Sequence, residues 1–323
     1  IPEPAPDQVQ VKIHATAVNP VDYKIFDYGM FVTVLPTVLG TDAAGEVTKV
    51  GGNVSNFRIG DRILFQGQYN CQGDYSNGDK ATFQQFCLTD ADLASKIPPS
   101  LDYDSASTIP VGIVTAAAGL YDLSLGLTSP WKPGGEGKYR GQVMVVLGGS
   151  SSVGSYTIQL AALSGFKVIT TASASHETYL KSIGASTVID RKSSTLVDDV
   201  LEAAGGEVRY LMDAIALPNT QKNAVDIVSP GGSVILTLPA EQSIMISAMK
   251  KRVRLRGCHG ASHMYPDSIG FWAAMEGYLE RGVIKPNRPH VLPGGLASWK
   301  EAFELHRSGK VSGEKIVLRP QET

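Results

Sequence analysis

The sequence predicts an α/β fold with two domains: a doubly wound parallel sheet, and a second domain that is β-rich and partly barrel-like. Between residues 143 and 256, apolar strand-like segments alternate with helical segments, which is typical of a doubly wound sheet. Before residue 115, short strands separated by glycine turns indicate the β-rich domain. We expect the β-rich domain to comprise residues 1–115 and 262–323, and the parallel sheet to occupy residues 116–261.

The parallel sheet is organised around Val143–Leu147, five apolar residues that predict a buried central strand. Glycines and serines then form a tight turn, and Ser155–Leu163 has the spacing of an amphipathic helix. Such a unit presents backbone N–H groups to an anion and holds the pyrophosphate in dinucleotide-binding folds. Aligned on Gly149 and Gly154, the usual middle glycine is Ser151. Because this glycine fingerprint is incomplete, the prediction of dinucleotide binding also needs support from the strands and helices that follow the turn.

The elements after this turn continue the alternation. The expected strands are Lys167–Ala172, Thr187–Asp190, Tyr210–Asp213, Ser233–Leu238 and Val253–Arg256. The expected helices are His176–Ile183, Leu196–Ala204 and Asn219–Val228. With the central strand they make about six strands, which supports dinucleotide binding.

The end of the second strand bears on which dinucleotide binds. NAD-binding chains place an Asp or Glu there, about 20 residues after the glycines, to bond the ribose 2′-hydroxyl. Residues 171–176 contain no carboxylate, and Ser173, Ser175 and His176 offer hydroxyls and a cation. Arg191, just after the third strand, can approach the same corner. These groups favour the 2′-phosphate of NADPH, and the alternative is a solvated turn with an unrelated arginine.

The remaining segments complete the β-rich domain and the connections. The expected strands and turns are Gln8–Ala17, a turn at Leu39–Gly45 with the strand Val47–Val50, the turn and strand Gly60–Phe65, and the last strand Lys315–Arg319. The expected helices are a short one from Asn19, Ala106–Leu123 joining the domains, and Phe271–Arg281. Gln66–Lys80 is expected to form a surface loop over the site, and Ser129–Gly141 a flexible approach to the central strand.

Composition narrows the functional class. The 323 residues are 43% hydrophobic and 19% charged with a net charge of −2, which is typical of a soluble globular chain with two domains. No basic excess indicates nucleic acid, and no apolar run approaches the roughly 20 residues that span a bilayer. The three cysteines are far apart and odd in number, and no signal peptide is visible; both favour a cytoplasmic location. The chain begins at Ile1 without a methionine, which is compatible with a missing native N-terminus.

A succession of motifs runs through the chain: Val18–Lys24, Gly40–Gly45, Val50–Val54, Gly60–Arg62, Gly148–Gly154 and Ser312–Lys315. Their content and order resemble the medium-chain dehydrogenase/reductase superfamily over essentially the whole chain. Within it, the chain is similar to the zinc-free branch of quinone oxidoreductases and enoyl reductases, and to fungal stand-alone enoyl reductases that act in trans with polyketide synthases. The resemblance implies a GroES-like catalytic domain for residues 1–115 and 262–323 and a Rossmann domain for residues 116–261.

The resemblance also bears on metal binding. In the zinc alcohol dehydrogenases, a cysteine ligand stands at the position of Asn19 and a histidine ligand at the position of Thr41. An amide and a hydroxyl are poor substitutes for thiolate and imidazole. No close cysteine pair exists for a structural zinc site. We therefore expect no metal, and hydride delivery to an activated double bond rather than alcohol oxidation.

The resemblance places residues 19–24 and 110–115 on either side of the nicotinamide. The expected cofactor contacts are Asn19, Val21, Gly149, Ser150, Ser151, Ser152, Val153, Gly154, Ser173, Ser175, His176, Arg191, Leu236, Cys258, His259, Val311 and Ser312. The expected substrate contacts are Pro110, Val111, Gly112 and Thr115.

Three side chains are candidates for catalysis. Lys24 could donate to a thioester or ketone oxygen, or be an ordinary surface lysine. Thr115 could bond the acceptor carbonyl or cap a turn of the linking helix. Tyr23 could supply a proton or simply pack. Cys258 and His259 are expected to line the site rather than to react. With no convergent acid–base pair, we expect water to supply the α-carbon proton.

These expectations favour an NADPH-dependent enoyl or enone reductase acting on a small-molecule or acyl-carrier-bound unsaturated substrate, with a polyketide synthase as a partner. Two alternatives stay open: an NADPH quinone oxidoreductase, and an NADPH-binding protein with a structural or docking role. Neither a nucleic acid nor a membrane is expected as a partner. The sequence leaves open whether the chain is a monomer or a homodimer.

Overall fold

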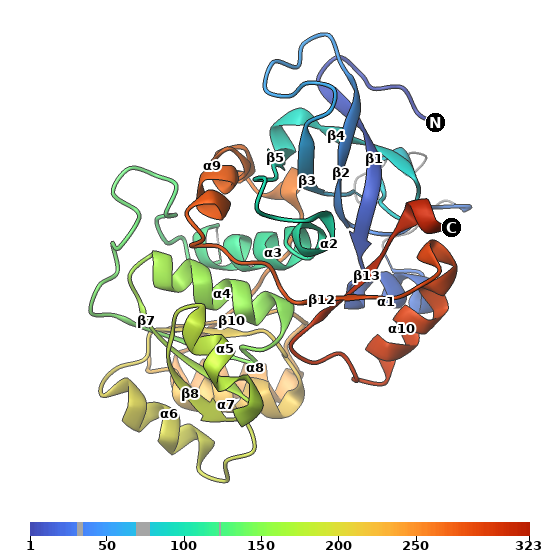
Figure 1. Ribbon diagram of the computed structural model, residues 1–323. Helices are drawn as coiled ribbons and strands as arrows, with labels where there is room; N and C mark the ends of the chain where they lie inside the picture. The colour runs from blue at the N-terminus through green and yellow to red at the C-terminus, as the bar shows by residue number, and fades with distance from the viewer. Residues whose placement is uncertain (31–34, 69–77, 123) are drawn as a thin grey trace. The chain divides into compact units, whose positions relative to one another are not determined.

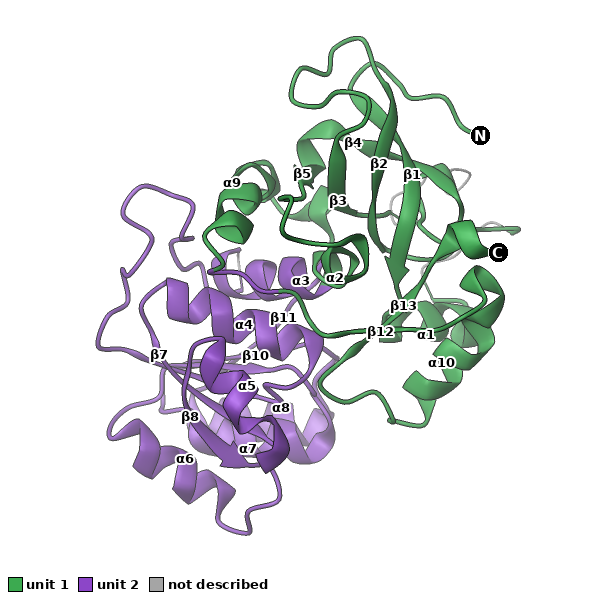
Figure 2. Cartoon of the chain, in the orientation of Figure 1, with its two compact units in different colours: residues 1–111, 261–282, 286–323 green, residues 112–260, 283–285 purple. Residues whose placement is uncertain are grey.

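The computed structural model describes residues 1–30, 35–68, 78–122 and 124–323. The chain forms two compact units (Figure 2). Unit 1 comprises residues 1–111, 261–282 and 286–323, and unit 2 comprises residues 112–260 and 283–285. Among the described helices, none is long and apolar enough to cross a bilayer.

Unit 2 is built on a six-stranded parallel sheet with the order β11-β10-β9-β6-β7-β8. Figure 1 labels β7, β8 and β10 of this sheet. Its strands are β6 (Val143–Leu147), β7 (Lys167–Ala172), β8 (Ala185–Asp190), β9 (Tyr210–Asp213), β10 (Ser233–Leu236) and β11 (Arg254–Gly257). Its helices are α4 (Ser152–Leu163), α5 (Glu177–Ser182), α6 (Leu196–Ala204), α7 (Pro218–Ile227) and α8 (Gln242–Lys251), together with most of α3 (Pro110–Tyr121). The doubly wound α/β prediction is confirmed.

Strand β6 lies between β7 and β9 in the sheet, and its successive residues Met144–Leu147 are all buried, so both of its faces are covered. Val145 and Leu147 share one core cluster with residues of α6, α7 and α8. This burial explains why the strand is a continuous apolar run rather than an alternating one. Because every parallel strand ends at the same edge, the loops after β6, β7, β9 and β10 gather along that edge of unit 2.

Unit 1 contains a mixed sheet with the order β12-β13-β1-β2-β3-β5, and β4 also pairs with β1. Its strands are β1 (Gln8–Ala17), β2 (Asp42–Val50), β3 (Arg62–Gln66), β4 (Phe86–Asp90), β5 (Ala94–Lys96), β12 (Pro289–Val291) and β13 (Lys315–Leu318). Its helices are α1 (Pro20–Tyr28), α2 (Tyr103–Ser107), α9 (Ser268–Glu280) and α10 (Trp299–Arg307). All pairs are antiparallel except β12 with β13. The expected mixture of short strands is confirmed as a mixed sheet of the GroES-like type.

Several boundaries differ from the sequence predictions. The single helix predicted over Ala106–Leu123 is wrong, since α2 ends at Ser107 and α3 begins at Pro110. Proline lacks an N–H and favours the first turn of a helix, which explains the break. Leu123 and most of the predicted loop Gln66–Lys80 lie outside the described residues.

The turn predicted for Leu39–Gly45 is wrong in its second half, because β2 begins at Asp42. Helix α4 begins at Ser152 rather than Ser155, because the Ser151 hydroxyl accepts the Gly154 N–H at 3.1 Å and caps the helix.

Candidate cofactor and substrate site

The turn between β6 and α4 is compact because two glycines allow close backbone contacts. A Cβ on Gly149 would lie 2.1 Å from Thr170 Oγ1, and one on Gly154 would lie 2.2 Å from the Gly148 carbonyl oxygen. Both positions therefore exclude larger side chains. Ser150, Ser152 and Val153 are half-buried around this turn. The N-terminus of the twelve-residue helix α4 thus carries a small, polar and partly exposed turn, which fits a pyrophosphate.

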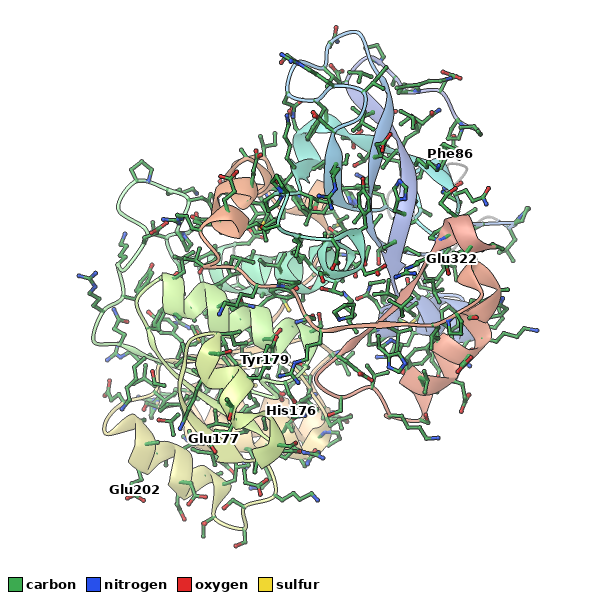
Figure 3. The ribbon with its side chains drawn as sticks, in the orientation of Figure 1. Phe86, His176, Glu177, Tyr179, Glu202 and Glu322 are labelled. Atoms are coloured by element: carbon green, nitrogen blue, oxygen red, sulfur yellow. The ribbon has the colours of Figure 1, made fainter. Side chains whose placement is uncertain are left out.

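The end of β7 brings together the groups expected at a 2′-phosphate. The Arg191 N–H donates to the Ala172 carbonyl at 2.9 Å, and the Arg191 Nε donates to Ser173 Oγ at 3.0 Å. Ser175 is exposed in the short 3-10 turn Ala174–His176, and Figure 3 labels His176 beside α5. An exposed guanidinium with neighbouring hydroxyls fits a phosphate monoester.

Replacing Arg191 with alanine is expected to weaken NADPH binding by about tenfold or more, ~1.4 kcal/mol, and to leave NADH binding nearly unchanged. The reason is that only the 2′-phosphate would use the guanidinium. Fluorescence titration with both cofactors measures the ratio of their dissociation constants. Lys192→Ala is the matched control, since Lys192 is an exposed neighbouring cation. Equal affinities of the unchanged chain for NADPH and NADH would contradict this prediction.

The loop after β11 lies beside the end of β10. Leu236 is buried, and its carbonyl accepts the Cys258 N–H at 3.2 Å and the Cys258 thiol at 3.7 Å. Burial raises the pKa of the Cys258 thiol to about 12, so the thiol is protonated at neutral pH and is a poor nucleophile. His259 is exposed. These properties favour a lining role for this loop.

Two predicted substrate contacts in unit 2 lie on the first turns of α3. A Cβ on Gly112 would lie 2.4 Å from Ser152 Oγ and 2.8 Å from Tyr156, so α3 approaches the start of α4 closely there. A Cβ on Gly260 would lie 2.0 Å from Thr115 Oγ1. The Thr115 hydroxyl therefore lies beside the loop that follows β11, and the two helices and this loop form one corner of unit 2.

In unit 1, Asn19 is held by a buried polar network. The Asn19 N–H donates to Asp22 Oδ2 at 2.7 Å. The Asn19 side chain donates to Asp42 Oδ2 at 2.8 Å and to Thr41 Oγ1 at 3.4 Å. Thr41 and Asn19 thus contact one another, and Asn19 is committed to hydrogen bonds within the protein.

The other predicted residues of α1 differ in their surroundings. Tyr23 is half-buried, with its ring 6.5 Å from that of His306 and 5.7 Å from the Arg307 guanidinium. Burial raises the pKa of the Tyr23 phenol, which favours packing over proton donation. Lys24 and Val21 are half-buried, and no described residue forms an ion pair or hydrogen bond with the Lys24 ammonium.

The remaining predicted contacts of unit 1 lie at two chain segments. Pro110 is buried and Val111 is half-buried at the start of α3. Val311 packs against the core cluster that contains Val18 and Phe303, and Ser312 is exposed.

Sequence reasoning assigned no role to three charged residues of unit 1: Asp22, Asp42 and Lys315. All three are at most 3% exposed, and Asp42 and Lys315 form an ion pair. Both members of the pair stand in the motifs Gly40–Gly45 and Ser312–Lys315. The sequence signal that could have identified Asp42 and Lys315 is that each is a charged residue within a motif composed largely of small residues.

The pH dependence of stability should reveal Asp22. Burial raises the pKa of Asp22 to about 8, while an unfolded aspartate titrates near 4. Between these values the native state keeps a proton that the unfolded state releases, so this group makes stability fall as pH rises from about 4 to about 8. Asp22→Asn is neutral throughout and keeps an acceptor for the Asn19 N–H. We expect the urea midpoint of Asp22→Asn to rise steadily relative to that of the parent from about pH 4 to about pH 8; parallel pH profiles would contradict the assignment.

In the described ranges of the chain, no three His, Cys, Asp or Glu side chains are grouped so that they could hold a metal ion.

Two family models match the chain. Residues 5–99 match the alcohol dehydrogenase GroES-like domain, and residues 152–274 match the zinc-binding dehydrogenase domain.

Curated relatives match with moderate identity. Dehydrogenase pigH of Monascus ruber is 42% identical over 214 residues, 64% of this chain and 56% of that protein. Trans-enoyl reductase himH of Aspergillus japonicus is 31% identical over 318 residues, 96% of this chain and 89% of that protein. The enoyl reductase component lovC of the lovastatin nonaketide synthase of Aspergillus terreus is 29% identical over 331 residues, 97% of this chain and 89% of that protein.

Among solved structures, an alcohol dehydrogenase superfamily protein from Novosphingobium aromaticivorans is 25% identical with a TM-score of 0.80, covering 98% of this chain and 93% of that one. The first family model lies within unit 1, the second covers most of unit 2 and continues into residues 261–274 of unit 1, and the himH alignment extends over nearly the whole chain. The chain therefore belongs to the medium-chain dehydrogenase/reductase superfamily and has fungal trans-enoyl reductases among its relatives.

Proposed function

We propose that the chain is an NADPH-dependent, zinc-independent reductase that delivers hydride to the β-carbon of an α,β-unsaturated thioester or ketone. One observation carries this proposal. Asn19 and Thr41, which stand where the zinc alcohol dehydrogenases have ligands, bond to one another, and the Asn19 amide also donates to Asp42. An amide and a hydroxyl bound in this way are poor zinc ligands. Reduction of an activated double bond needs no metal alkoxide.

When bound, NADPH supplies the hydride, and the protein has two tasks. It must hold the acceptor in a reactive orientation, and it must stabilise the negative charge that develops on the carbonyl oxygen. Lys24 and the Thr115 hydroxyl are the proposed donors to that oxygen. The high pKa of the Tyr23 phenol disfavours it as an acid, and we assign the α-carbon proton to water.

The cofactor assignment rests on residues within unit 2. The turn at Gly149–Gly154 fits the pyrophosphate, and Arg191 with Ser173 fits the 2′-phosphate. No carboxylate stands at the end of β7, where NAD-binding chains hold the ribose.

We further propose that the substrate is an acyl chain presented by a polyketide synthase. The support comes from relatives: himH is named a trans-enoyl reductase, and lovC is named a component of a synthase. Each alignment covers at least 96% of this chain. A free acyl thioester of small size serves as the test substrate, since the reacting atoms are the same.

The test follows hydride and proton separately. With an α,β-unsaturated acyl thioester, deuteride from labelled NADPH should appear at the β-carbon and solvent deuterium at the α-carbon. The same NADPH oxidation assay is run with enones and with quinones. Label at the carbonyl carbon, or turnover with quinones and with none of the unsaturated carbonyl compounds, would contradict the proposal.

A further inference from the structure

The carboxylate of Asp42 joins three separate segments of unit 1. Its side chain is fully buried at the first residue of β2. Asp42 Oδ1 accepts the Val111 N–H at 2.6 Å, and Oδ2 accepts the Asn19 side-chain N–H at 2.8 Å. The Lys315 ammonium also donates to Oδ2. Three donors that are far apart in the sequence thus converge on one side chain.

Each donor stands next to proposed site residues. Asn19 is the N-cap of α1, which carries Lys24. Val111 is the second residue of α3, which carries Thr115. Lys315 begins β13, three residues after Ser312. The three residues that donate to Asp42 are therefore themselves proposed contacts, or lie within five positions of proposed contacts, of unit 1.

Stability alone does not require this arrangement. A buried ion pair gains little over well-packed apolar side chains of similar volume, because removing two charges from water is costly. The arrangement does require a carboxylate, since both of its oxygens accept hydrogen bonds, Oδ1 from Val111 and Oδ2 from Asn19 and Lys315. An asparagine offers a single acceptor oxygen and turns an N–H group toward one of the donors.

We propose that Asp42 is a positioning residue for hydride transfer: it fixes the start of α1, the start of α3 and the segment before β13 relative to one another within unit 1. This inference rests on the proposed function. Misplacement of reacting groups by about 1 Å can cost about 10²-fold in rate. A shift of the start of α1 would misplace the proposed donor Lys24, and a shift of the start of α3 would displace the proposed substrate contacts Pro110 and Val111.

The main variant is the double replacement Asp42→Asn with Lys315→Met, which removes both charges and leaves no unpaired buried ion. We expect it to fold, with kcat for the acyl thioester reduced about 10- to 100-fold. The dissociation constant for NADPH should change less than kcat does, because the proposed phosphate contacts lie in unit 2 and only the proposed contacts of unit 1 are displaced. A kinetic isotope effect with deuterated NADPH should rise as hydride transfer becomes limiting. A purely structural role would leave the isotope effect and kcat of the folded variant unchanged.

Amide hydrogen exchange gives a readout that needs no turnover. The Val111 N–H should exchange at least about tenfold faster in the double variant. The matched control is Asp104→Asn, which removes a carboxylate of unit 1 that bonds Arg319 at 2.6 Å and touches none of the proposed site residues. The control should keep the parental kcat and the parental exchange rate at Val111.

Two failures can be told apart. If the parent reduces none of the unsaturated carbonyl compounds, the proposed function fails, and so does a role of Asp42 in that reaction, whatever the exchange data show. If the parent is active and the folded double variant keeps parental kcat, isotope effect and Val111 exchange, the positioning role is overturned while the proposed function stands.

Discussion

Gly154→Ala is expected to raise the dissociation constant for NADPH about 100-fold, ~2.7 kcal/mol. The new methyl group would lie 2.2 Å from the Gly148 carbonyl oxygen and 3.0 Å from its carbon. Neither atom belongs to a flexible side chain, so the first turn of α4 must move away from the loop. Overpacking of this kind typically costs about 1–3 kcal/mol. The N–H groups of this turn would hold the pyrophosphate, so moving the turn is expected to weaken cofactor binding.

Isothermal titration calorimetry with NADPH measures this effect, and thermal unfolding shows whether the variant is folded. The matched control is Gly206→Ala, since a Cβ on Gly206 would have no neighbour within 4 Å and the residue lies in the same unit. The control should bind NADPH like the parent. A folded Gly154→Ala chain with parental affinity would place the pyrophosphate elsewhere.

The parallel sheet could be predicted because its signal is local. The strands Lys167–Ala172 and Tyr210–Asp213 and the helix Leu196–Ala204 match the structure residue for residue. Each is a short apolar or amphipathic run bounded by small or polar residues, so periodicity alone identifies it.

The first half of β2 could not be predicted in the same way. Asp42–Gly45 contains two alanines, a glycine and an acid, none of which favours a strand. The segment is extended because it pairs with β1 and β3. A Cβ on Gly45 would lie 2.2 Å from the Lys12 carbonyl oxygen. The glycine therefore allows β2 to approach β1 closely, a contact that exists only in the folded chain.

The candidate site likewise has a part that local motifs predict and a part that they do not. The turn at Gly149–Gly154 and the pairing of Ser173 with Arg191 follow from motifs and from strand order, and the described geometry fits the expected phosphates. The network around Asp42 depends on Lys315, which is 273 positions away. Sequence spacing carries no information about such a contact, and its position inside two motifs was the available indication.

Lys24→Ala and Thr115→Val are each expected to slow reduction of an acyl thioester by about 10²–10³ in kcat without abolishing it. That range is typical for the loss of one hydrogen-bond donor to a developing oxyanion. Lys24 is half-buried on α1, where its ammonium is the donor that we propose for the substrate oxygen. NADPH affinity should persist in Thr115→Val, because the change keeps the shape of the side chain and removes its hydroxyl.

The control for the lysine is Lys300→Ala, a cation of unit 1 that lies over the Trp299 ring on α10; it should leave kcat unchanged. Lys24→Arg should recover part of the lost rate, because it restores a cationic donor. If Lys24→Ala keeps the parental kcat, the lysine is an ordinary surface residue, and the charge on the oxygen must be stabilised by Thr115 and by backbone N–H groups.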